Sequence, residues 1–190
     1  MKKITVFQIC FMAFCTVINL AGGSIALMLK LPVYLDCIGT LLTAALLGPV
    51  YGVLPGILSG IISGMSTDVY AFYYIPVQII TGLMAGIVFK TSWVKKWKTP
   101  LGTLFISLPG TAVSAGITAY LFGGVTSSGS SILVAVLNKL GMNLVLSVFA
   151  VQALTDYLDR FLAVGITAAV LALMTNSMKM QIKIGHNGTM

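Results

Sequence analysis

Charged side chains are scarce in this chain of 190 residues: they make up 8% of it, and Glu does not occur at all. Soluble domains carry roughly a quarter charged residues. Hydrophobic residues make up 58%, which is more than a soluble monomer of this size removes from water. The same numbers exclude disorder, because disordered chains combine low hydrophobicity with high net charge. The composition therefore predicts an all-α, polytopic integral protein of the plasma membrane.

Metal-ligating and catalytic residue types are equally rare. The only His is His186, and Cys10, Cys15 and Cys37 lie in apolar surroundings without a C-x-x-C pair. These cysteines are typical of small core residues rather than of a disulfide or metal framework, so we expect no metal and no cofactor. The motifs G-x-x-x-x-G-K-[ST], H-E-x-x-H and G-x-S-x-G do not occur. We therefore expect neither an enzyme nor a protein that hydrolyses ATP by itself.

Long apolar runs dominate instead, and a helix needs roughly 20 apolar residues to cross a bilayer. We expect one transmembrane domain over residues 1–190, a six-helix bundle in which the second and third helices form a short hairpin. The expected spans are residues 4–29, 35–48, 50–65, 75–90, 101–122 and a last helix that residues 156–160 open. Residues 123–155 hold a further apolar stretch, which would give seven spans if it crossed the membrane.

The distribution of cationic residues favours six spans. With the N-terminus and the tail at residues 179–190 in the cytoplasm, only Lys30, Lys139 and Arg160 lie outside, in keeping with the positive-inside rule. The other cationic residues then lie inside: Lys2, Lys3, Lys90, Lys95, Lys96, Lys98, Lys179 and Lys183. Residues 123–155 become a long outer segment, partly helical, that packs on the bundle as a lid.

This topology gathers polar groups on the outer face. All four acidic residues fall at outer helix ends or in outer loops: Asp36, Asp68, Asp156 and Asp159. Asp156 and Arg160 are four residues apart at the start of the last helix, so we expect them to pair with each other. The inner face is basic and otherwise plain. The asymmetry predicts a pocket that opens to the outside.

A glycine occurs at every fourth position through the third expected helix, at Gly48, Gly52, Gly56, Gly60 and Gly64. This spacing places the glycines in one stripe, and small residues let helix backbones approach each other closely in lipid. The stripe therefore predicts tight packing of this helix against its neighbours.

The main candidate for ligand binding is the aromatic loop after this helix. Tyr70, Tyr73 and Tyr74 offer ring faces and hydroxyls suited to a small planar polar ring, although Tyr is also enriched at membrane interfaces. Asp68 and Gln78 favour binding, because an interfacial aromatic belt needs neither a carboxylate nor an amide.

Further binding candidates lie before the second expected helix and in the outer segment. Asp36 and Thr40 share one helix face just after Tyr34, where Asp36 contacts a ligand, caps the helix or is simply solvated. Asn143 and Gln152 suit a lid that hydrogen-bonds a ligand, or a structural pairing.

Several stretches resemble the substrate-binding S components of energy-coupling factor (ECF) vitamin transporters. They are LPVYLDCIGT at residues 31–40, LGPVYG at 47–52 followed by the glycine stripe, GGVTSSGSS at 123–131 and DYLDR at 156–160. The resemblance implies a six-helix bundle that captures a water-soluble vitamin or its precursor from outside. It also implies docking onto a transmembrane scaffold subunit driven by two ATPase subunits.

In S components the first helix contacts the scaffold through small residues at A-x-x-x-A spacing. The nearest matches here are Ala13 with Val17 and Gly22 with Ala26. The aromatic and acidic candidates favour a neutral or weakly basic heteroaromatic ligand, such as the hydroxymethylpyrimidine precursor of thiamine or pyridoxine. The alternatives are a stand-alone channel or exporter for small molecules and a membrane scaffold that binds no ligand.

Sidedness is directly testable. A reporter domain fused at Asp68 is expected to read out as extracytoplasmic, because six spans with a cytoplasmic N-terminus place the aromatic loop outside. Fusions at Lys98 serve as the cytoplasmic control. A cytosolic signal at Asp68 would contradict the topology and with it a pocket open to the outside.

Overall fold

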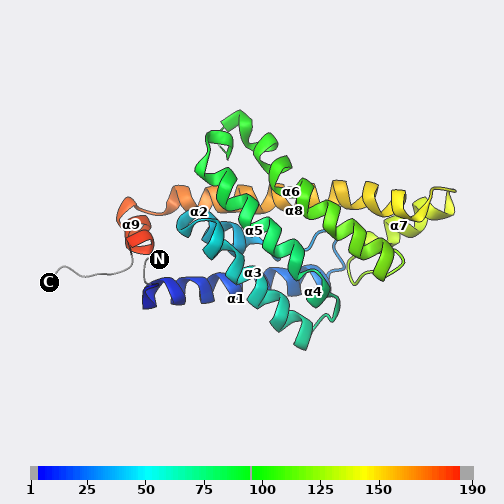
Figure 1. Ribbon diagram of the computed structural model, residues 1–190, viewed down its shortest axis with the longest axis horizontal. Coiled ribbons are helices and arrows are strands. Elements are labelled where there is room, and N and C mark those ends of the chain that lie inside the picture. The colour runs from blue at the N-terminus through cyan, green and yellow to red at the C-terminus, as the bar shows by residue number, and fades with distance from the viewer. Residues whose placement is uncertain (1–3, 95, 185–190) are drawn as a thin grey trace.

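A computed structural model describes residues 4–94 and 96–184, and the expectations that concern Lys2, Lys3, Lys95 and His186 lie outside these residues. All regular secondary structure in the described part of the chain is helical, and no strand occurs there. Figure 1 shows the arrangement of its elements. In chain order they are α1 (Val6–Met28), α2 (Ile38–Leu47), α3 (Pro49–Ser66), α4 (Tyr70–Tyr73), α5 (Ile75–Lys90), the 3₁₀ turns η1 (Ser92–Val94) and η2 (Lys96–Lys98), α6 (Thr99–Gly116), the π turn η3 (Ile117–Leu121), α7 (Ser130–Lys139), α8 (Leu144–Leu173) and α9 (Asn176–Ile184).

Three helical segments are long and apolar enough to cross a membrane: α1, α3, and α6 continued by η3. The pair α8 and α9, bent by 110° at its break, gives a fourth if it is counted as one span. Helices α2 and α5 are shorter. The expected all-α class is therefore confirmed, and three or four apolar helices are long enough to span a membrane. The expected number of six spans stays a prediction.

The longest helix differs from the sequence expectation. Helix α8 begins at Leu144 and continues unbroken to Leu173, so the expectation that the last helix begins near Asp156 is wrong. Asn143 caps the helix by accepting a hydrogen bond from the backbone N–H of Val145 at 2.9 Å. Residues 130–139 form the separate short helix α7, which packs beside the first part of α8 (Figure 1).

Helices α2 and α3 form the expected hairpin, with Gly48 alone between them at a φ of +97°. The glycine stripe of α3 lets its neighbours approach closely, as predicted. A Cβ built on Gly52 would lie 2.7 Å from the Cα of Ala44 in α2. One built on Gly82 of α5 would lie 2.9 Å from the carbonyl carbon of Gly52. The three backbones therefore touch where glycine is present, and no side chain fits between them.

The replacement Gly82→Ala is expected to lower the free energy of unfolding by about 1–3 kcal/mol, because the added methyl group overpacks a backbone contact. Gly165→Ala in α8 is the matched control: nothing lies within 4 Å of its Cβ position, and alanine favours a helix by up to ~1 kcal/mol. Thermal unfolding in detergent measures both. Equal melting temperatures for the two variants would contradict close packing between α3 and α5.

Candidate functional site

A cavity of about 80 Å³ lies within the bundle, on a scale where one water molecule needs ~10–15 Å³. Its walls come from α1, the connection at residues 29–37, α3, α4, α5, α6, the loop at residues 122–129 and α8. This volume holds several water molecules or one small organic molecule. The cavity is therefore a place in the described structure that could hold a ligand.

Six of the ten residues that the sequence nominated for binding line this cavity. They come from four separate parts of the chain: Tyr34, Asp36, Asp68, Tyr74, Gln78 and Gln152. Two aromatic candidates and two amide candidates are thus brought together, although 118 positions separate Tyr34 from Gln152 along the chain.

The other four nominated residues make structural contacts instead. Thr40 is fully buried, and its hydroxyl accepts a hydrogen bond from the Asn19 amide at 2.8 Å. Tyr70 and Tyr73 set their ring edges against Phe122, with centroids 4.7 and 5.1 Å away. Asn143 is exposed at the N-terminus of α8, where it caps the helix. None of the four lines the cavity.

A chain of hydroxyl and amide groups forms one wall. The Tyr74 hydroxyl lies 2.5 Å from that of Thr118, which accepts a hydrogen bond from the Gln152 amide at 2.6 Å. The single hydroxyl proton of Ser114 is shared between two acceptors, the Gln152 carbonyl oxygen at 2.9 Å and Asp156 at 3.0 Å. Ser114 of α6 and Thr118 of η3 therefore pair with α8, and Ser114 also faces the cavity.

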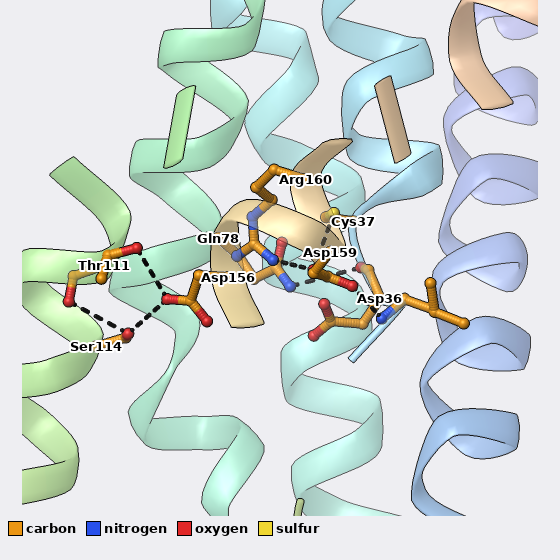
Figure 2. Close-up of polar contacts among 9 residues, drawn as sticks. Asp36, Cys37, Gln78, Thr111, Ser114, Asp156, Asp159 and Arg160 are labelled. Carbon is orange, nitrogen blue, oxygen red and sulfur yellow. Dashed lines mark hydrogen bonds and ion pairs between the residues drawn. The ribbon is translucent and has the colours of Figure 1, made fainter. Parts of the chain in front are cut away.

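Two carboxylates that we expected at an outer helix end lie in the middle of α8 and are buried. Asp156 and Asp159 are 6% and 1% exposed. Thr111 and Ser114 each donate to Oδ2 of Asp156 at 3.0 Å (Figure 2). These hydroxyls donate hydrogen bonds to a carboxylate whose neighbours in the sequence are mostly apolar. Helix α8 can therefore continue through its charged residues.

The expected pairing of Asp156 with Arg160 is wrong, because the guanidinium of Arg160 forms its ion pair with Asp159 (Figure 2). Asp159 also accepts a hydrogen bond from the backbone N–H of Leu35 at 2.7 Å, and Cys37 Sγ lies 3.7 Å from its other oxygen. The pair therefore fastens α8 to the connection between α1 and α2, and Arg160 lines the cavity beside it.

Sequence reasoning missed Arg160, Asp156 and Asn19 as cavity residues. The available signal was an ionisable cluster within an apolar stretch that holds no proline or glycine from residue 142 to residue 164. Such residues inside a spanning helix mark functional sites by default. In the sequence alone, however, charges at this position are typical of a helix end.

Two hydrogen bonds join the loop at residues 122–129 to other segments at the cavity. Ser127 donates to a carboxylate oxygen of Asp68 at 2.5 Å, and the Gly129 N–H donates to the Leu31 carbonyl at 3.1 Å. Tyr34 lies in the same connection as Leu31. Burial raises the pKa of its phenol above the ordinary value, so Tyr34 presents a neutral hydroxyl to a ligand.

Only one half of the Gln78 side-chain amide has a hydrogen-bond partner in the described part of the chain. Its nitrogen donates to the backbone carbonyl of Asp36 at 3.5 Å, while the side-chain oxygen is buried without a partner among the described residues. A buried acceptor that lacks a donor is costly unless something else supplies one. Asn19, in contrast, is satisfied by Gly39 N–H at 2.7 Å and by Thr40.

Possible ligand atoms for a metal occur together once in the described part of the chain. Those of Asp36, Cys37 and Asp159 lie within 4.8 Å of one another. Arg160 pairs with Asp159 at the same place. The guanidinium thus already supplies the positive charge that a cation would bring.

The residues expected to contact a scaffold do not share one surface. Ala13 and Val17 are exposed on α1, whereas Ala26 is buried and lines the cavity. Gly22 packs against the Leu35 carbonyl. Of these four residues, only Ala13 and Val17 can therefore belong to a docking face on α1.

Comparison of the chain with protein-family models, with curated proteins and with solved structures finds no match.

Replacing Arg160 by Met is expected to lower the free energy of unfolding by about 3–5 kcal/mol, because Asp159 would remain as an unpaired buried charge. The control Lys139→Met removes an exposed cation at the end of α7. Thermal unfolding in detergent compares the two. The double variant Asp159→Asn with Arg160→Met should recover part of the loss, and an Arg160→Met protein as stable as the control would refute the role of the pair.

Proposed function

We propose that the chain is the substrate-capture subunit of an ECF-type importer, and that it binds a small water-soluble vitamin or vitamin precursor in the central cavity. The observation that carries this proposal is the cavity itself. It is enclosed by helices whose outer surfaces are apolar, yet its lining includes Asp36, Asp156, Arg160, Gln78 and Gln152. Polar and ionisable groups are expensive inside an apolar bundle, and such groups mark ligand sites by default.

The size and the aromatic groups of the cavity favour a single small ring. Tyr34 and Tyr74 both line it, with ring centroids 6.3 Å apart and planes tilted by 40°. Aromatic faces beside convergent amides and carboxylates suit a heteroaromatic ring with polar substituents. The hydroxymethylpyrimidine precursor of thiamine and pyridoxine are ligands of this kind.

The importer part of the proposal rests on the resemblance of residues 31–40 and 47–52 to S components. Those two stretches include the connection that lines the cavity and the start of the glycine-packed α3. The chain has no phosphate-binding loop for ATP, so the energy for release would come from partner ATPase subunits through a scaffold subunit. The exposed side of α1 near Ala13 and Val17 is the candidate docking surface.

Calorimetry of the detergent-solubilised protein against hydroxymethylpyrimidine, pyridoxine and pantothenate tests ligand binding. We expect saturable binding of at least one of them. Tyr74→Ala should weaken that binding about tenfold, because a ring contact and its hydrogen bonds are worth roughly 1–2 kcal/mol. Tyr120→Ala is the matched control, since Tyr120 is 80% exposed and does not line the cavity.

Two results would contradict the proposal. One is a folded protein that binds none of these compounds. The other is accumulation of solute by vesicles that hold the purified chain alone, which would indicate a self-sufficient transporter rather than a capture subunit.

A further inference from the structure

The buried charges around the cavity do not balance. Asp36 and Asp156 line it, Asp159 lies beside Asp36 and Arg160, and Arg160 is the only cationic residue that lines it within the described part of the chain (Figure 2). The guanidinium is already paired with Asp159. Asp36 and Asp156 thus have no ion-pair partner of their own among the described residues, and a buried carboxyl group without such a partner is costly to ionise.

The hydrogen-bonding groups show the same imbalance. Gln78 is 5% exposed and lines the cavity, and its side-chain oxygen accepts no hydrogen bond from any described residue. Both hydroxyl donors near Asp156 reach its Oδ2, so the other oxygen keeps its capacity to accept (Figure 2). The site is therefore rich in acceptors, and a ligand that satisfies it must bring donors.

An anionic ligand fits these groups poorly. It would have to approach two carboxylates and to compete with Asp159 for the guanidinium of Arg160. A neutral ring would bring no positive charge to Asp36 and Asp156. A protonated nitrogen supplies both the positive charge and several N–H donors to oxygens of one cavity wall.

We infer that the cavity selects a ligand carrying a protonated nitrogen, such as an ammonium or amidinium group on a small heteroaromatic ring, held by Asp36, Asp156 and the Gln78 side-chain oxygen. This inference rests on the proposed function and specifies its substrate class. It favours an amino-substituted ring, of which the aminopyrimidine precursor of thiamine is an example, over pyridoxine.

Three probes with the same pyridine ring isolate the effect of charge: pyridoxamine, pyridoxine and 4-pyridoxate carry an ammonium, a hydroxyl and a carboxylate at the same position. Calorimetry on the full chain in detergent should give affinities that fall in this order, by about tenfold or more from pyridoxamine to pyridoxine. The substitution Asp156→Asn keeps an oxygen that accepts from Thr111 and Ser114 but removes the charge. It should lower the affinity for pyridoxamine about tenfold and that for pyridoxine much less.

The control Gln181→Lys raises the net charge by the same amount at an exposed position in α9 and should leave all three affinities unchanged. Binding of pyridoxine or 4-pyridoxate as tight as that of pyridoxamine to the unmodified protein would overturn the inference while leaving the proposed function in place. Absence of binding for these probes and for the whole vitamin panel would overturn both. Because the probes are compared on the unmodified chain, the inference is tested even where Asp156→Asn fails to fold.

Discussion

Asp159 connects parts of the chain that are far apart in sequence. One of its oxygens accepts from the backbone of Leu35, and the other faces Arg160 and Cys37. Leu35 itself has a positive φ of 52°, which a residue with a side chain adopts only when its surroundings hold it there. The carboxylate therefore fixes the connection between α1 and α2 against the middle of α8. Because that connection forms one wall of the cavity, the shape of the site depends on a single buried ion pair.

The cavity lies beside well-packed core. Leu41, Ile106 and Val164 are among the fully buried side chains, and they join one apolar cluster between α2, α5, α6 and α8. The glycines of α3 and α5 close the neighbouring helix contacts down to backbone distance. Natural interiors leave few spaces larger than a water molecule. A space of about 80 Å³ with polar walls, next to contacts this close, is therefore a specific feature of the fold rather than loose packing.

Much of the fold was predictable from hydrophobic runs and glycine spacing, because α1, α3 and α5 each follow an uninterrupted apolar segment with a clear end. The start of α8 was not, because the charges at residues 156–160 are typical of a helix end when only the sequence is considered. Their partners, Thr111 and Ser114, lie on α6. Local sequence contains no information about such pairing. The site was likewise predictable only in part. Its aromatic and amide residues can be recognised from the sequence, whereas Arg160 becomes part of the site only through tertiary contacts.

At this site, the side chains that would bind a ligand lower the stability of the unliganded chain. A well-packed apolar group in place of a buried ion pair often leaves a protein equally stable or more stable, so Asp159 and Arg160 are weak evidence for stability alone. The unpaired oxygen of Gln78 and the buried carboxyl groups of Asp36 and Asp156, which have no ion-pair partner among the described residues, add a further cost that better packing would remove. A ligand that supplies the missing donors and charge removes the same cost when it binds, and it stabilises the folded chain by mass action. The groups that destabilise the empty bundle are therefore the same groups that give it selective affinity for a ligand.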